Sequence, residues 1–434
     1  MILLPAIWNG FPFVFPDTGG YLLRPFAHDL ELGRSALYGA FLAAGLSLDF
    51  WPDVAIQALL SAWIISLVAR SSGLQRPSAA FVVIAALCLS TSLPWYADQL
   101  MPDIFVPLAV LAIYLIAFAA TNLRRWETAS LIAVIAFAVA FHMSICAVLL
   151  LLFAVIAVLW VMAPAIRLPQ PRLFAPALGI ALGIVLALSS NYVIAGTAAF
   201  TPGGSNFLFA RMLEDGFVKS YLDHACGTKA YSLCAYRDSL PSTRDDWLWD
   251  DDGSPLAKLG GWRKFAPEAS RIVAGSLMLQ PLEQLRAVAR GTLAQLEAAA
   301  TGDGFEGKYD WHTEWVFKTY APKAMPAFRA AAEQRGAIDF HLLNLLQLPL
   351  AISATLLLPC LFVICWRCRT PAATLVLTAL AALLANAIIC AMFSGIADRY
   401  QSRIIPVAVL ADGLAGYELL RLLRRSKAAI STAA

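Results

Sequence analysis

The sequence predicts an all-α polytopic membrane protein. Of the 434 residues, 60% are hydrophobic and only 14% are charged, which excludes an ordinary soluble globular domain. Several apolar runs approach the roughly 20 residues that a helix needs to cross a hydrocarbon core. Because the sequence has no ten-residue segments in which apolar and polar residues alternate, a helical bundle is favoured over a β-barrel.

Nine membrane spans are predicted from apolar runs that end at proline, glycine or charged residues. They lie near residues 52–70, 78–94, 102–121, 128–141, 144–163, 175–195, 345–365, 372–393 and 403–420. The alternation of loops requires one more crossing before residue 15, but residues 1–14 are short and are interrupted by Pro5 and Pro12. We therefore expect about nine to ten spans and a true N-terminus that lies upstream. The alternative is an N-terminal helix that only dips into the membrane.

The charges of alternate loops predict the orientation of the chain. Twelve basic residues and one acidic residue, Glu127, lie in the loops 70–77, 122–127, 164–174 and 366–371 and in the tail from 421. By the positive-inside rule, these segments face the cytoplasm. The opposite segments then face outward: 15–51, 95–101, a break at His142, 196–344 and 394–402.

Three regions follow: an N-terminal transmembrane block over 1–195 with the outer loop 15–51, an inserted extracytoplasmic domain over 196–344, and a C-terminal transmembrane block with a cytoplasmic tail over 345–434. The inserted domain holds 16 of the 32 basic and 18 of the 29 acidic residues, as a water-exposed domain would. Its second half predicts helices over 265–279 and 281–300, where apolar residues recur at spacings of three and four. Cys226 and Cys234 are close enough in sequence to form a disulfide in an oxidising compartment.

The first half of the inserted domain is rich in aspartate and tryptophan. A divalent cation could bind to the carboxylates of Asp245, Asp246, Asp250, Asp251 and Asp252, but their spacing matches no EF-hand loop and a solvated turn is the default interpretation. The sequence therefore assigns no metal ligand and no certain cofactor. Anchoring at the membrane interface is the preferred role of the tryptophans, and sugar stacking is the alternative: Trp247, Trp249, Trp262, Trp311 and Trp315.

The first outer loop is the densest in groups that can carry chemistry. Asp17 follows an apolar aromatic run and precedes Thr18-Gly19-Gly20-Tyr21, so its carboxylate is expected at the membrane surface, where it can act as a general base. Tyr21 follows four residues later and is a candidate for substrate binding. Arg24 and Arg34 are the basic residues of the loop, and arginine suits bidentate binding of a phosphate.

Three later segments add polar groups to the same face. Asp98 and Asp103 lie in the second outer loop, although helix-dipole stabilisation alone would explain an aspartate just after Pro102. His142 breaks a long apolar stretch and is either a ligand contact or a polar group at a helix break. Near the C-terminus the candidate residues for binding a lipid-linked phosphate are Arg399, Tyr400 and Arg403.

These motifs resemble those of the GT-C superfamily of integral-membrane glycosyltransferases. The likeness rests on PDTGGYL at 16–22, GRSALYGAFL at 33–42 and DRYQSRIIP at 398–406, together with the short, irregular spans. It implies transfer of a sugar from a polyprenyl-phosphate donor to an acceptor on the outer face of the membrane. It also implies that Asp17 is the general base, that Arg399 or Arg403 binds the donor phosphate, and that Asp98 or Asp103 is the second acidic position.

The chain departs from the family pattern in three respects. The first span is truncated, the soluble domain lies between spans, and the paired acidic motif of the first loop is reduced to Asp17 with Asp29 and Glu31 further on. The expected partners are a lipid-linked sugar donor, membrane lipids and an unidentified acceptor. No nucleic acid partner is expected, and no P-loop or GxGxxG unit is present to bind a nucleotide sugar. A composition rich in alanine and arginine with few lysines suggests a multi-pass protein of a bacterial inner membrane.

Two other classes of function remain open from the sequence. A transporter or flippase for a lipid or polar solute would use the intramembrane Asp412 together with His142. A non-catalytic subunit of an envelope assembly would need none of these residues for chemistry.

Overall fold

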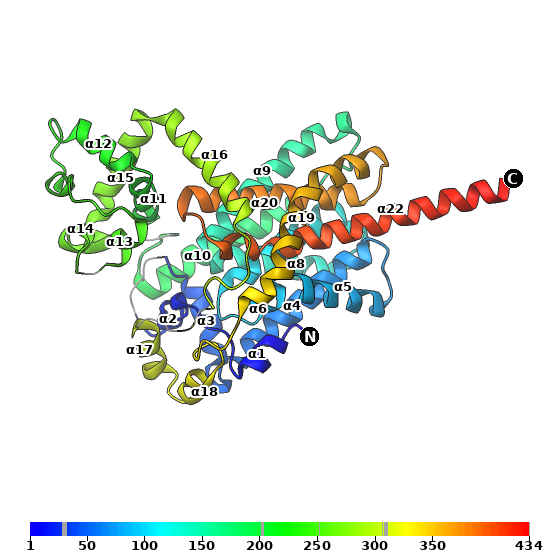
Figure 1. Ribbon diagram of the computed structural model, residues 1–434, viewed down its shortest axis with the longest axis horizontal. Helices are drawn as coiled ribbons and strands as arrows, with labels where there is room; N and C mark the ends of the chain where they lie inside the picture. Colours follow the sequence, from blue (N-terminus) through cyan, green and yellow to red (C-terminus); the bar gives the residue numbers. More distant parts are fainter. Residues whose placement is uncertain (28–32, 201–203, 251, 306, 308–310, 434) are drawn as a thin grey trace.

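The computed structural model describes residues 1–27, 33–200, 204–250, 252–305, 307 and 311–433. The regular secondary structure of this part of the chain is all helical, with one isolated bridge between Phe13 and Gln99 (Figure 1). Asp29, Glu31 and Asp251 lie outside the described residues. The N-terminal helices are α1 (Leu4–Asn9), α2 (Pro16–Leu23), α3 (Ala36–Gly45), α4 (Trp51–Ser71), α5 (Pro77–Ser90), α6 (Leu93–Ala97), α7 (Phe105–Phe118), α8 (Arg125–Phe141), α9 (Met143–Ile166) and α10 (Phe174–Ala195).

The second half of the chain is also helical. Its helices are α11 (Gly204–Glu214), α12 (Phe217–Ala225), α13 (Arg244–Trp249), α14 (Pro255–Lys258), α15 (Gly261–Leu279), α16 (Pro281–Glu297), α17 (Trp311–Tyr320), α18 (Met325–Ala330), α19 (Phe340–Arg367), α20 (Ala372–Phe393), α21 (Asp398–Ser402) and α22 (Ile405–Ala433). The helices predicted over 265–279 and 281–300 are confirmed as α15 and α16, with Pro281 at the first position of α16, where its missing N–H is tolerated.

Five helices in the described residues are long and apolar enough to cross a membrane: α4, α9, α10, α19 and α20. They match the spans predicted near 52–70, 144–163, 175–195, 345–365 and 372–393. Among the other four predicted spans, α5 and α7 have only 14 residues and α8 has 17. The last, α22, carries Asp412, Glu418 and Arg421 along its apolar part. The chain is therefore a helical membrane protein in which several helices are shorter than a full span.

The basic loops gather at one end of the helical bundle. Arg70, at the end of α4, pairs with Glu127 at the start of α8, with a shortest distance of 2.7 Å. The Trp366 indole donates to the Ile166 carbonyl at 2.7 Å, which joins the ends of α19 and α9. The first turn of α7, the junction of α8 and α9, and α21 lie at the other ends of helices that reach these loops. The segments that carry the candidate site therefore lie opposite the basic loops.

The segment predicted as one inserted domain divides into two parts. Residues of α11–α15 form a separate hydrophobic core around Phe209, Trp247 and Phe265, and these helices stand apart from the bundle in Figure 1. Helix α16 packs on α20 of the bundle. The part that contains α17 and α18 joins the main core, because Phe317 and Phe328 pack against Phe11 of the N-terminal segment, with ring centroids 6.5 and 6.0 Å away.

Candidate functional site

Asp17 lies in the first turn of α2, which begins at Pro16. Thr18, the third residue of the helix, accepts a hydrogen bond through its hydroxyl from the N–H of the N-cap residue Phe15 at 2.9 Å, as the third residue of a capping box does. Gly19 is required at the next position, because a Cβ there would lie 2.7 Å from the Cα of Thr313. Helix α17 therefore packs closely against α2, and the Thr313 hydroxyl donates a hydrogen bond to the Pro16 carbonyl.

The Asp17 carboxylate is held by an arginine of the same outer loop. An oxygen of Asp17 lies 2.5 Å from a terminal nitrogen of Arg34, and the two side chains are 27% and 12% exposed. The Arg34 guanidinium also lies 5.8 Å from the centroid of the Tyr21 ring and 6.0 Å from that of Trp249 on α13. One face of Arg34 therefore meets the α11–α15 unit, while its terminal nitrogen orients Asp17.

Asp103 forms the buried centre of a second charged group. Its two oxygens lie 2.9 Å from Arg403 and 3.5 Å from Arg399, and its side chain is 3% exposed. Arg403 is as buried as Asp103 and also donates to Asn386 at 3.1 Å. Because Arg403 is enclosed by protein partners, its best-supported role is to hold Asp103, whereas Arg399 lies at the edge of the group with 12% of its side chain exposed.

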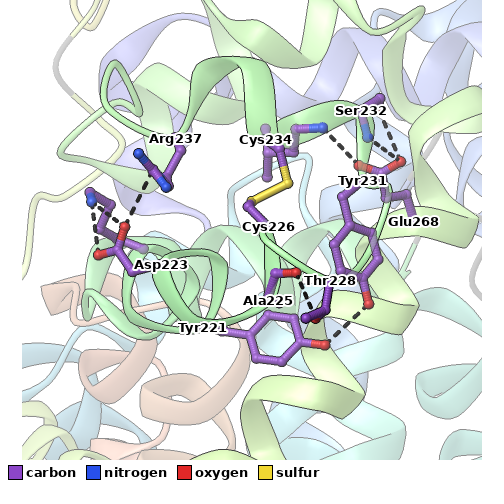
Figure 2. Close-up of a disulfide and its surroundings, with 12 residues drawn as sticks. Tyr221, Asp223, Ala225, Cys226, Thr228, Tyr231, Ser232, Cys234, Arg237 and Glu268 are labelled. Carbon is purple, nitrogen blue, oxygen red and sulfur yellow. Dashed lines mark hydrogen bonds and ion pairs between the residues drawn. A yellow bond between two sulfur atoms is a disulfide. The ribbon is translucent and has the colours of Figure 1, made fainter.

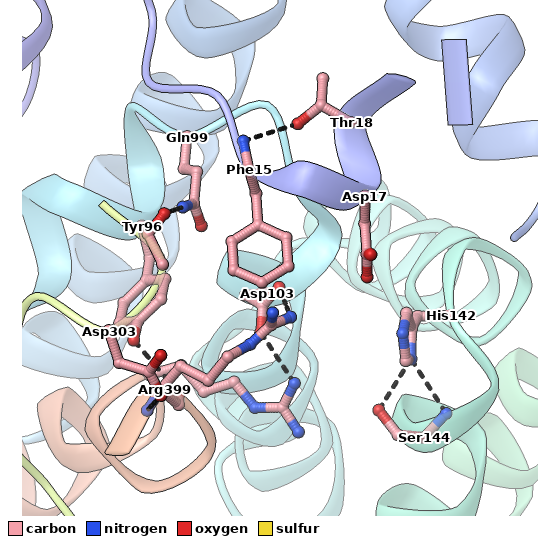
Figure 3. Close-up of polar contacts among 12 residues, drawn as sticks. Phe15, Asp17, Thr18, Tyr96, Gln99, Asp103, His142, Ser144, Asp303 and Arg399 are labelled. Atoms are coloured by element: carbon pink, nitrogen blue, oxygen red, sulfur yellow. Dashed lines mark hydrogen bonds and ion pairs between the residues drawn. The ribbon is translucent and has the colours of Figure 1, made fainter. Parts of the chain in front are cut away.

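Aromatic rings and a further carboxylate position Arg399. Its guanidinium carbon lies 3.8 Å from the centroid of the Phe15 ring and 5.2 Å from that of Tyr400 (Figure 3). The backbone N–H of Arg399 donates to Asp303 at 3.1 Å. Tyr400 lies between the two arginines, because Arg403 is 5.3 Å from its ring centroid. Cation–π contacts of this kind hold a guanidinium flat while its edge stays available to an anion.

The two charged groups and His142 lie around one region. Arg34, Asp17, Asp103 and Arg399 all act electrostatically on Tyr21, and Asp103, Arg403, Arg34 and Arg399 all act on His142. In Figure 3, the side chains of Asp17, Asp103, Arg399 and His142 come from four separate segments of the chain. The structure therefore brings together Asp17, Asp103, Tyr21, Arg34, His142, Arg399, Tyr400 and Arg403 from the residues that the sequence singled out.

Asp98 does not join this group. The Asp98 side chain is fully buried and accepts a hydrogen bond from the Ala6 N–H at 2.8 Å, so it fastens α1 to the second outer loop. Burial raises the pKa of Asp98 to about 8. Arg24 is buried at the end of α2, where its Cβ lies against Gly39. Of the two aspartates in that loop, Asp103 is the one that belongs to the site.

Tyr21 packs behind the charged side chains of the site and is not exposed to solvent. Its side chain is fully buried, with its ring 5.0 Å from that of Tyr38, and its hydroxyl has no hydrogen-bond partner in the part of the chain that the structure describes. Burial raises the pKa of its hydroxyl far above the ordinary value.

Sequence reasoning missed Phe15 and Asp303. In the sequence, Phe15 is one of several aromatic residues before Asp17, and Asp303 is one of 18 acidic residues in 196–344. The available signal for Asp303 was its position between two glycines, Gly302 and Gly304. In the structure both glycines have positive φ. A Cβ at Gly304 would lie 2.2 Å from the Phe15 ring, so glycine lets this loop approach the site.

The inserted segment shows no metal centre in its described residues, since no group of three or more His, Cys, Asp or Glu side chains there or elsewhere in the described chain could hold an ion. Asp250 instead accepts hydrogen bonds from the backbone of Asp252 and Gly253 and so caps a turn. Trp247 lies in the core of the α11–α15 unit, whereas Trp249 is 52% exposed. Cys226 and Cys234 are joined in a disulfide that closes a short loop after α12 (Figure 2).

The geometry can bind an anion beside a carboxylate. Arg399 and Arg34 supply the cations, and Asp17 supplies a carboxylate able to accept a proton. Comparison with protein-family models, with curated proteins and with solved structures finds no match to this chain.

Proposed function

We propose that this protein is a GT-C-like glycosyltransferase that moves a sugar from a polyprenyl-phosphate donor to an acceptor, with Asp17 as general base. The observation that carries the proposal is the convergence of Asp17, Arg399 and Asp103, from segments more than 80 residues apart, at the end of the bundle opposite the basic loops. A proton acceptor and a phosphate-binding cation in one place are the two groups that such a transfer needs.

The reaction assigns one step to each group. The Asp17 carboxylate takes the proton of the acceptor hydroxyl, whose oxygen forms the new bond to the anomeric carbon. The bond from that carbon to the phosphate oxygen breaks, and the electron pair leaves with the lipid phosphate. Arg399 neutralises the charge of this leaving group, Asp103 and Phe15 hold Arg399, and Arg34 orients Asp17.

The membrane arrangement supports a lipid-linked donor. Helix α7 has 14 residues and so rises only about 21 Å, less than the roughly 30 Å of a hydrocarbon core. Asp103, just before α7, would then lie at the depth of the lipid rather than above it. The positive-inside rule would place the basic loops in the cytoplasm and the site and the α11–α15 unit on the outer face of a bacterial inner membrane.

The test is transfer of a radiolabelled sugar from a polyprenyl-phosphate donor in membranes that contain the D17N variant. Asparagine can still accept a hydrogen bond from Arg34 but cannot take a proton. Loss of a general base lowers rates by roughly 100-fold or more, so we expect transfer to fall to background at unchanged protein abundance. The matched control is D49N, in the same loop, where the left-handed backbone of Asp49 also suits asparagine. Transfer by D17N at the wild-type rate would refute the proposal.

Transport of a lipid or polar solute is the second candidate, and one observation favours it. Both carboxylate oxygens of Asp412 on α22 are buried, and they have no hydrogen-bond partner among the described residues. Intramembrane carboxylates commonly mark transport paths. A transporter should lose movement of a fluorescent lipid across proteoliposomes in D412N and keep it in D17N, whereas a transferase should show the reverse dependence for sugar transfer.

A further inference from the structure

His142 occupies the single-residue break between α8 and α9. Its backbone is extended, with φ −153° and ψ 133°, and it is the N-cap residue of α9. The N-terminus of a helix presents backbone N–H groups without intrahelical partners, which a side-chain acceptor at the N-cap satisfies. The local structure therefore gives the imidazole one task inside the protein, which is to cap α9.

The capping contact determines which ring nitrogen carries the proton. The Ser144 backbone N–H lies 3.1 Å from Nδ1 of His142, and the Ser144 hydroxyl lies 2.7 Å from the same nitrogen (Figure 3). A backbone N–H can only donate, so Nδ1 must be the acceptor. In a neutral imidazole the proton then sits on Nε2, which becomes a hydrogen-bond donor.

The other ring nitrogen, Nε2, is not used by the cap, whose contacts are both to Nδ1. Nε2 makes no hydrogen bond to the part of the chain that the structure describes. The His142 residue is partly exposed. The charges that act on the ring are those of Asp103, Arg403, Arg34 and Arg399. Burial, together with the three arginines, lowers the pKa of His142 to about 4, so the ring is neutral at physiological pH.

We propose that His142 is a neutral hydrogen-bond donor that binds a phosphate oxygen of the substrate through Nε2–H. The identity of this ligand rests on the proposed function, whereas the position of the proton rests on the contacts of Nδ1 alone. A neutral donor adds to the cations of Arg399 and Arg34 a directed contact that a phosphate can accept. His142 cannot serve as the general base in this state, because its one acceptor nitrogen is occupied by Ser144.

Two substitutions separate the cap from the donor. In H142N the amide lies at the position of Nδ1, so its oxygen can cap α9, but nothing replaces Nε2–H. In H142Q the amide nitrogen reaches the position of Nε2, so the donor is kept while the cap is weakened. If His142 only caps α9, the opposite order is expected: H142N should behave more like the wild type than H142Q does.

The experiment measures binding of a short-chain polyprenyl phosphate to the purified full-length protein in detergent. We expect H142N to bind roughly tenfold more weakly, the effect of about 1.4 kcal/mol, and H142Q to stay within about threefold of the wild type. Wild-type binding by H142N, or tighter binding by H142N than by H142Q, would overturn the donor role. Absence of binding to the wild-type protein would overturn the phosphate as ligand.

A second measurement addresses the proton directly. The protein has five histidines, so ¹⁵N-labelled imidazoles can be assigned by comparison with H142N. We expect long-range ¹⁵N–¹H spectra to show a protonated Nε2 and an unprotonated Nδ1 for His142 at neutral pH. A proton on Nδ1 would refute the inference whether or not D17N abolishes transfer, so failure here is distinct from failure of the proposed function.

Discussion

The guanidinium of Arg399 lies on the ring of Phe15, with 3.8 Å between the guanidinium carbon and the ring centroid. Phe15 is two residues before Asp17, whereas Arg399 belongs to α21, near the other end of the chain. This contact links the carboxylate of the first outer loop to the cation of the last one. It also fixes the plane of the guanidinium, so that an anion can approach its edge.

Replacement of Phe15 by leucine tests this contact. Leucine keeps an apolar side chain but removes the aromatic face, which contributes about 1–2 kcal/mol to a partly desolvated arginine. We expect F15L to bind a polyprenyl phosphate roughly tenfold more weakly than the wild type, measured by titration in detergent. F26L removes a ring that stacks on Tyr320 and not on Arg399, so it should leave binding unchanged. Equal losses in both variants would show that general packing, not the Phe15 contact, is responsible.

The buried pair of Asp103 and Arg403 should contribute strongly to stability. Both side chains are at most 3% exposed, so removal of one partner leaves the other charged and without compensation. We expect R403M to destabilise the protein by about 3–5 kcal/mol, measured as a lower Tm in detergent.

A double variant separates the pair from its surroundings. Because D103L/R403M buries neither charge, we expect it to be more stable than either single variant, although without polyprenyl-phosphate binding, since Arg399 loses its carboxylate partner. If R403M unfolds at the wild-type temperature, the pair has no net role in stability.

The fold was largely predictable because hydropathy reports on helices that are long, apolar and bounded by charge. All five full-length candidate spans were predicted, as were α15 and α16. The short helices α5 and α7 were not separable from full spans, because their flanking residues are also apolar and enter buried loops. Hydropathy measures the environment of a residue and not whether its backbone remains helical.

The site was predictable at the level of residue types, and less so in its partners. Asp17 and Arg399 stood out because charges are rare near the membrane, whereas the roles assigned to them stay predictions. The structure was needed to choose Asp103 over Asp98, because the two aspartates have similar apolar neighbours in the sequence. Only tertiary contacts bring Arg399 and Arg403 to Asp103. The division of residues 196–344 was also hidden, because Phe317 and Phe328 pack with residues far away in sequence.

The raised pKa of Asp98, about 8, predicts a pH dependence of stability. Asp98 has a pKa of about 3.9 in the unfolded state, so between this pH and about pH 8 the folded state holds a proton that the unfolded state has lost. The contribution of Asp98 to the free energy of unfolding is therefore complete below about pH 4 and is lost as the pH rises to about 8. D98N keeps an acceptor for the Ala6 N–H without titrating. We expect the Tm of the wild type to fall relative to the Tm of D98N as the pH rises from 5 to 8. A difference that is constant over this range would contradict the burial of a protonated Asp98.

The disulfide between Cys226 and Cys234 should stabilise the α11–α15 unit and not the bundle. Its loop is short, with a sequence separation of 8, so the chain-entropy contribution is about 2.5 kcal/mol. We expect C226S/C234S to increase protease cleavage within residues 204–279 roughly 70-fold, with unchanged exchange of the bundle amides. C368S, which changes an exposed free cysteine of the bundle, is the control. Equal acceleration of cleavage in the bundle would show that the unit and the bundle unfold together, although the two hydrophobic cores are separate in the structure.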